Sequence, residues 1–91
     1  MRLKTEKGVK NMGTSRETIS RWLDYMYETD GVTHMLVVCD TYDYEDYPVY
    51  IREGRDPAKY VSGSMQRVME CYSKNYEKLA QLNQFRAFNY D

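Results

Sequence analysis

The chain has 91 residues, enough for one domain and too few for two. With 42% hydrophobic and 30% charged residues and only two prolines, its composition is that of a folded protein and excludes general disorder. The longest apolar run, Met35 to Cys39, excludes a membrane-spanning helix, which needs about 20 such residues. The net charge of −1 is unevenly placed: residues 1–22 carry +4 and residues 23–91 carry −5, which predicts a basic end and an acidic body.

The first predicted element is a helix from Ser15 to about Glu28, with Ser15 or Thr14 as its N-terminal cap. Its apolar residues recur at the spacing of one helical face, and they are Ile19, Trp22, Leu23 and Met26. Residues 1–12 precede this helix, and we expect them to form a flexible basic arm of a single domain that covers residues 1–91.

Two strands are predicted next. Thr33 to Thr41 contains an unbroken apolar segment that is too short for a helix and rich in valine, which favours a central strand covered on both faces. Pro48 then opens a second strand, Val49 to Arg52, because proline suits a strand's first residue or a sheet edge. The connection between them is short, so we expect an antiparallel hairpin.

Two helices complete the predicted fold. Asp56 and Pro57 form a strong start for a short helix, and Ser64 can cap a long helix from Met65 to about Leu82. The long helix would carry an apolar stripe of Met65, Val68, Met69, Tyr72, Tyr76, Leu79 and Leu82. The stripe is longer than a hairpin can cover, so its remainder should pack on the first helix or on a second copy of the chain, and we expect a homo-oligomer through this helix. The predicted class is α+β, in the order α-β-β-α-α.

Residues 13–23 resemble the turn and recognition helix of helix-turn-helix regulators, in which glycine makes the turn and the next serine caps the helix. The resemblance implies that Arg16, Glu17 and Arg21 contact DNA, with Lys4 to Met12 as the preceding helix. The basic bias of residues 1–22 agrees with this. The alternative is an ordinary amphipathic helix, since these residues also cap and form helices well.

The stretch from Asp40 to Tyr50 holds four acidic residues and four tyrosines within eleven positions. It is the main candidate binding site, because tyrosine offers a large contact area at little entropic cost. The candidate contact residues are Asp40, Tyr42, Asp43, Tyr44, Glu45, Asp46 and Tyr47, with Arg52, Arg55 and Arg67 nearest to them in the predicted topology. The simpler alternative is an exposed loop whose tyrosines fold back onto the sheet.

Two partners fit this site. The carboxylates can imitate phosphate charge toward a nucleic-acid-binding host protein, whereas the arginines can hold the phosphates of a small nucleotide-like ligand. Three segments, 37–51, 65–72 and 86–90, together resemble a family of small bacteriophage proteins over about His34 to Tyr90. The resemblance implies a phage-type binding protein that blocks host machinery in the host cytoplasm, as anti-CRISPR proteins and proteins that sequester signalling nucleotides do.

Catalytic residues do not assemble into any known constellation, so we expect no enzymatic activity and no cofactor. His34 is the sole histidine and lies on the predicted central strand, where a structural role is expected. Cys39 and Cys71 are predicted to be free thiols in a reducing cytoplasm, because the N-terminus lacks the apolar stretch of a signal peptide. A disulfide, or a metal shared with His34, is the alternative, but the spacing of metal-binding cysteine pairs is missing.

Overall fold

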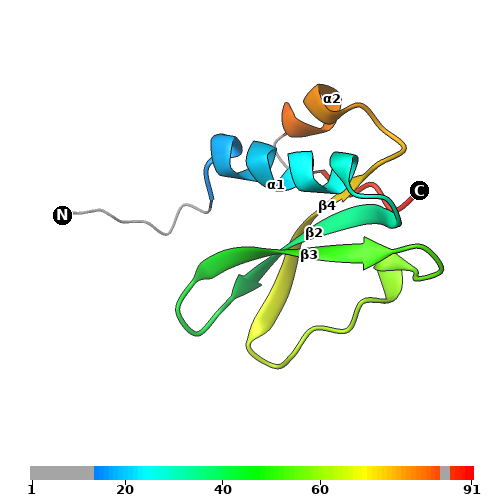
Figure 1. Ribbon diagram of the computed structural model, residues 1–91. Coiled ribbons are helices and arrows are strands. Elements are labelled where there is room, and N and C mark those ends of the chain that lie inside the picture. Colours follow the sequence, from blue (N-terminus) through cyan, green and yellow to red (C-terminus); the bar gives the residue numbers. More distant parts are fainter. Residues whose placement is uncertain (1–13, 85–86) are drawn as a thin grey trace.

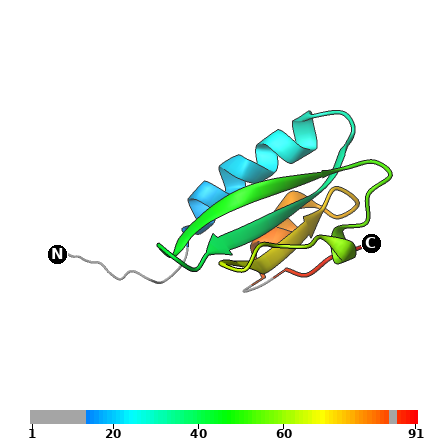
Figure 2. The ribbon, with the colours of Figure 1, turned by 90° about the horizontal axis from the view of Figure 1, so that it is seen from below.

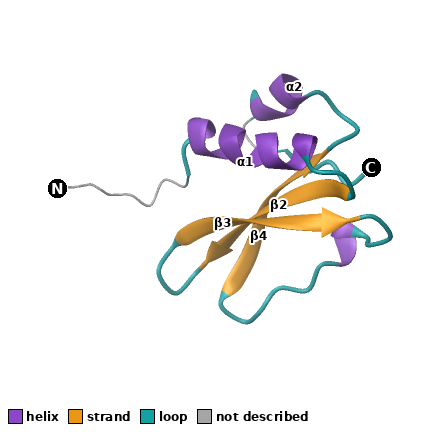
Figure 3. Cartoon of the chain, viewed as in Figure 1, coloured by secondary structure: helices purple, strands orange, loops and turns teal. Residues whose placement is uncertain are grey.

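The computed structural model describes residues 14–84 and 87–91. In these residues the chain forms an α+β fold in which a three-stranded antiparallel sheet carries helices on one face (Figures 1 and 3). The elements are α1 (Arg16–Glu28), β2 (Val32–Asp40), β3 (Glu45–Arg52), the 3-10 turn η1 (Pro57–Lys59), β4 (Gln66–Ser73) and α2 (Lys78–Leu82). The predicted basic arm, residues 1–12, lies outside the described residues.

Helix α1 confirms its prediction almost residue for residue. The side chain of Ser15 accepts a hydrogen bond from the Thr18 amide and so caps the first turn. The apolar face of α1 buries Ile19, Leu23 and Met26 against Met35 and Tyr72 of the sheet. The short helix α2 lies beside α1 on the same side of the sheet (Figure 1).

The opposite face of the sheet has a second, smaller core of Leu36, Val38, Ile51 and Cys71. The segment between β3 and β4 passes over this face, and Tyr60 packs against the core from there (Figure 2). Strand β2 is therefore buried on both faces and lies between β3 and β4, which confirms the central strand expected from its unbroken apolar run.

The predicted β2–β3 hairpin is also confirmed, although β3 starts at Glu45 and not after Pro48. The two strands pair from Asp40 with Glu45 to Val32 with Arg52. Pro48 lies within β3 opposite Val37 and cannot donate a ladder hydrogen bond. It is tolerated because β3 is an edge strand of the sheet.

The predicted helix from Met65 to Leu82 is wrong, and so is the α-β-β-α-α order. Residues 66–73 form the strand β4, a turn follows, and α2 has only five residues. Strand β4 has both faces covered: Val68 and Cys71 pack into one core, while Met69 and Tyr72 pack into the other. Apolar residues that serve two faces, with a register shift opposite Val37 and Val38, do not alternate strictly and so imitate the spacing of a helix.

The predicted homo-oligomer loses its basis, because no continuous helical stripe is present in the described residues. Ser64 caps no helix there, and the chain turns at that point into β4. Of the C-terminal tail, Phe88 pairs with Cys71 in a parallel bridge along the outer edge of β4, and Ala87 is fully buried. Phe85, another apolar residue of this tail, lies outside the described residues.

Candidate functional site

The structure divides the predicted site between the two ends of β3. Asp40 to Glu45 span the turn at one end, from the last residue of β2 to the first of β3, while Arg52 is the last residue of β3 at its other end and Arg55 follows it (Figure 1). An eight-residue strand separates the two groups by about 23 Å, at roughly 3.3 Å per residue. The acidic residues and these two arginines therefore cannot contact one small ligand together. We call residues 40–45 the acidic turn.

The acidic turn presents two tyrosines to solvent: Tyr42 is 79% exposed and Tyr44 is 72% exposed. Three hydrogen bonds between residues of the turn hold its backbone, and the Thr41 amide also donates to the Met65 carbonyl at 2.7 Å. The Tyr42 amide donates to Asp40 Oδ1 at 2.9 Å, the Glu45 amide donates to Asp43 Oδ1 at 3.2 Å, and the Tyr44 amide donates to the Asp40 carbonyl at 2.6 Å. Tyr44 has a φ of 60°, a left-handed conformation that is unfavourable for a bulky side chain. The turn is thus ordered, with its aromatic rings outward.

The carboxylates near the turn differ in availability. Asp43 and Glu45 are exposed and form no ion pair within residues 14–84 and 87–91. Asp46 is instead occupied, because its Oδ2 accepts hydrogen bonds from the amide and hydroxyl of Thr14 and so ties the start of α1 to β3. Tyr47 packs partly against the smaller core. These two predicted contact residues have structural roles.

At the other end, a groove of about 740 Å³ runs between β3 and the segment that contains η1. Its lining includes three cationic residues and one acid. The apolar part comes from Val49, Ile51, Tyr60 and Val61. The cationic residues are Arg52, Arg55 and Lys59, and the acid is Asp56, whose Oδ1 accepts from the Ala58 amide. We call this the basic groove.

Sequence reasoning found part of this groove. Arg52 and Arg55 were predicted contact residues, but Lys59, Tyr60 and Val61 were missed because residues 57–61 were assigned only a structural role as a short helix. The closeness of three cations in residues 52–59 was the available signal. Arg67, the third predicted arginine, does not join them: it is exposed at the start of β4, opposite Cys39 and near the acidic turn.

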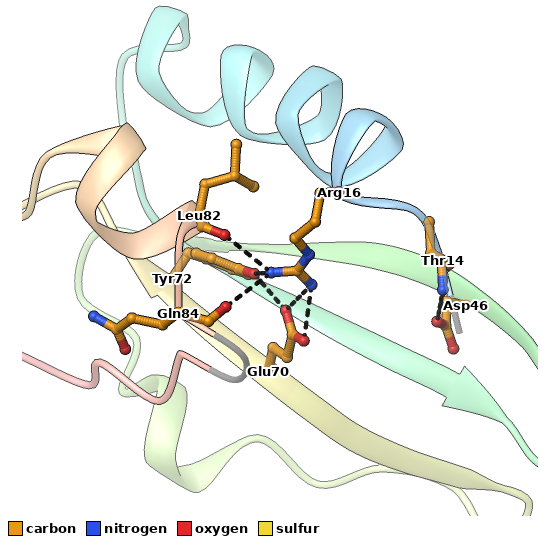
Figure 4. A network of polar contacts seen from close by, with 7 residues as sticks. All are labelled: Thr14, Arg16, Asp46, Glu70, Tyr72, Leu82 and Gln84. Atoms are coloured by element: carbon orange, nitrogen blue, oxygen red, sulfur yellow. Dashed lines mark hydrogen bonds and ion pairs between the residues drawn. The ribbon is translucent and has the colours of Figure 1, made fainter. Parts of the chain in front are cut away.

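The arginine at the start of α1 belongs to a polar network (Figure 4). Arg16 donates from Nη2 to both carboxylate oxygens of Glu70, at 3.0 and 2.9 Å, and from Nη1 to the Tyr72 hydroxyl at 2.9 Å. The carbonyls of Leu82 and Gln84 accept further bonds from Nη1. The hydroxyl of Tyr72 also donates to Glu70, and burial together with this bond raises the Tyr72 pKa.

This network bears on the helix-turn-helix resemblance. Of the three residues expected to contact DNA, Arg16 is turned toward the sheet and bound there, while Glu17 and Arg21 remain on the exposed side of α1 and lie 3.8 Å apart as an i,i+4 pair. Gly13 and the segment that would form the preceding helix lie outside the described residues. DNA reading by α1 stays a prediction, with one of its three contact residues already engaged.

The remaining candidates for chemistry lie in structural positions. His34 is buried on β2, with Nδ1 at 2.9 Å from Thr33 Oγ1 and Nε2 at 3.2 Å from the Asp91 main-chain oxygen. Cys39 and Cys71 are free, and the register places Cys71 opposite Leu36, about 10 Å along the strand from Cys39, beyond the reach of a disulfide. In the part of the chain that is described, His, Cys, Asp and Glu side chains form no group of three able to hold a metal.

Comparisons with protein-family models, with curated proteins and with solved structures find no match. The fold itself defines the class: a small α+β protein whose central antiparallel sheet has helices on one face and a loop segment on the other. None of the described helices has the length and apolar character needed to cross a bilayer. The phage-family and helix-turn-helix resemblances stay predictions.

Proposed function

We propose that this chain is a small non-enzymatic binding protein whose acidic turn engages a basic surface of a partner protein. The observation that carries the proposal is the outward display of Tyr42 and Tyr44 beside the carboxylates of Asp43 and Glu45, which form no ion pair with another described residue. Tyrosine is enriched among the residues that dominate binding energy, and nearby charges speed and orient association with a surface of opposite sign.

The ordered backbone of the turn supports this role. Three hydrogen bonds within the turn favour the conformation that displays the tyrosines, which lowers the conformational entropy that binding would cost. The turn also projects beyond the sheet, away from both cores (Figure 1). A projecting, rigid, acidic and aromatic surface suits insertion into a basic cleft more than capture of a small molecule.

A basic cleft is typical of proteins that bind nucleic acid. The carboxylates of the turn would imitate phosphate charge there and block access, and the resemblance to bacteriophage proteins suggests a host defence protein as the partner. The protein would thus act as a host-directed inhibitor in the cytoplasm of the host cell.

Carbodiimide crosslinking tests the proposal, since it joins carboxylates directly to lysine amines. We expect a crosslinked partner whose attachment maps to Asp43 or Glu45. The purified partner should then bind the Tyr42→Ala, Tyr44→Ala double variant about 100-fold more weakly, as expected when two dominant aromatic contacts are removed. Binding should also weaken in the Asp43→Asn, Glu45→Gln variant.

The matched control is Arg67→Ala, which changes an exposed charge at the same end of the sheet without touching the acidic turn. It should bind the partner as the unaltered protein does. A partner that binds all of the acidic-turn variants with unchanged affinity would refute the proposal.

A further inference from the structure

The basic groove is a concave site at the end of β3 that the proposed protein partner does not use. Its volume of about 740 Å³ lies in the range of small-molecule sites, roughly 300 to 1,000 Å³. The groove is formed where the chain reverses direction after β3: Gly54, with a φ of 85°, makes the turn, and Asp56 and Pro57 start η1. Both walls are therefore set by backbone structure.

The groove carries uncompensated positive charge. Arg52, Arg55 and Lys59 are exposed, and none of them forms an ion pair or a side-chain hydrogen bond within the described residues. The only acid in the lining, Asp56, uses one carboxylate oxygen to cap η1. By contrast, Arg16, Lys74 and Lys78 each bind an acceptor in the fold. The basic groove thus gathers three cations that have no ion pair among the described residues, whereas Arg67, which is also exposed, lies alone at the far end of the sheet.

The other part of the lining is apolar and aromatic. Ile51 is almost fully buried and forms the floor with Val49, while Tyr60 packs against the core from the opposite wall. Beside Tyr60, Val61 is 88% exposed, the most exposed of the large hydrophobic residues described. A flat ring between these side chains would cover apolar surface that now faces water.

We propose that the basic groove binds a nucleoside phosphate, with the base against Tyr60 and Val61 and the phosphate held by Arg55 and Lys59. The two halves of such a ligand match the two halves of the lining. Aromatic and apolar side chains take the planar base, and guanidinium and ammonium groups take the phosphate oxygens. Arg52 also belongs to the lining, but its Nη1 lies near Gly31, outside the groove, so the phosphate contacts are assigned to Arg55 and Lys59 alone.

Titration with adenosine monophosphate, followed by amide NMR shifts, tests this site. We expect saturable shifts at Gly54, Lys59 and Tyr60 and none at Tyr42 or Tyr44. Arg55→Ala should weaken binding about tenfold or more, as expected for loss of a charge-assisted bond. Tyr60→Leu keeps an apolar side chain in the core. It should weaken binding of the nucleotide and leave binding of inorganic phosphate unchanged. Arg67→Ala, which removes an exposed arginine at the far end, should change nothing.

Three results would overturn the assignment. If no amide shifts appear at about millimolar nucleotide, the groove is not a nucleotide site. If inorganic phosphate and the nucleotide bind with equal affinity, the groove does not recognise the base. Concentration-dependent self-association that Asp43→Asn, Glu45→Gln abolishes would show that the groove instead receives the acidic turn of a second copy. The first two results do not involve the acidic turn, so they would leave its proposed function standing, whereas the third would assign the acidic turn to a second copy of the chain and would count against both proposals.

Discussion

The two ends of β3 differ in both charge and shape. The acidic turn projects and carries carboxylates, whereas the other end forms the basic groove and carries cations; in the part of the chain that the structure describes, Asp43, Glu45 and the groove cations have no ion pair. A projecting surface can enter a cleft of a protein, and a hollow of this size can enclose a small molecule. Residues that a linear reading groups by closeness in sequence thus form two sites, because an extended strand places its ends far apart.

Both ends of β3 depend on the same sheet, which the network of Arg16 and Glu70 ties to α1. The largest expected effect therefore comes from a substitution in this network. Arg16→Met leaves the carboxylate of Glu70 buried without its cation, and the side chain of Glu70 is only 10% exposed. We expect a loss of about 2 to 3 kcal/mol in the free energy of unfolding, reduced from the value for a fully buried pair because Arg16 is 41% exposed.

Urea unfolding measures this loss. Arg21→Met is the control, because Arg21 lies on the exposed side of the same helix, where its partners among the described residues are Glu17 and Thr18. If Arg16→Met were as stable as Arg21→Met, the network would not hold α1 to the sheet. Both ends of β3 should keep their binding in whichever variant remains folded.

Alkaline pH should also destabilise the fold, because it ionises two buried side chains of β4. Burial raises the pKa of the Cys71 thiol from 9.0 to about 12, and burial and the bond to Glu70 raise that of Tyr72. A raised pKa means that the folded state holds the proton more tightly, so this stability is complete below pH 9 and is lost as pH rises from 9.0 toward 12. We therefore expect the free energy of unfolding to fall over that interval.

Cys71→Ala isolates the contribution of the thiol. Its free energy of unfolding should be lower than that of the unaltered protein at neutral pH, because packing is lost, but should fall less steeply above pH 9. Parallel pH profiles for the two proteins, measured by urea unfolding, would mean that the Cys71 thiol does not contribute.

A smaller effect is expected from a substitution in the acidic turn. Tyr44 occupies a left-handed conformation that glycine adopts without strain. Tyr44→Gly should therefore leave stability unchanged or raise it by up to about 1 kcal/mol, while it weakens binding to the protein partner. The midpoint of thermal unfolding of Tyr44→Gly and its affinity for the partner test this prediction. A clear drop in stability would indicate that Tyr44 serves the fold and not a partner.

The smallest expected effect concerns the exposed side of α1, which carries Glu17 and Arg21. With Arg16 bound to Glu70, we expect Arg21→Ala to elute from heparin at the same salt concentration as Arg67→Ala, which removes an equal charge elsewhere. Earlier elution of Arg21→Ala alone would support DNA reading by α1 instead.

Local sequence determined those elements whose signals lie within a few residues. The cap at Ser15 and the spacing of Ile19, Leu23 and Met26 were sufficient for α1, the apolar run from Met35 was sufficient for a central strand, and Asp56 with Pro57 was sufficient for η1. Each of these signals acts through neighbouring backbone groups or one continuous face.

Only tertiary structure decided what residues 65–82 become. Their apolar spacing fits a helix, but β2 has two edges and β3 can satisfy only one of them. The unpaired backbone groups of the other edge are matched by β4, and the two cores take its side chains from both faces. Hydrogen bonding between distant segments has no signature in local periodicity. The basic groove could not be predicted from local sequence for the same reason, because its walls meet only after the chain turns back along β3.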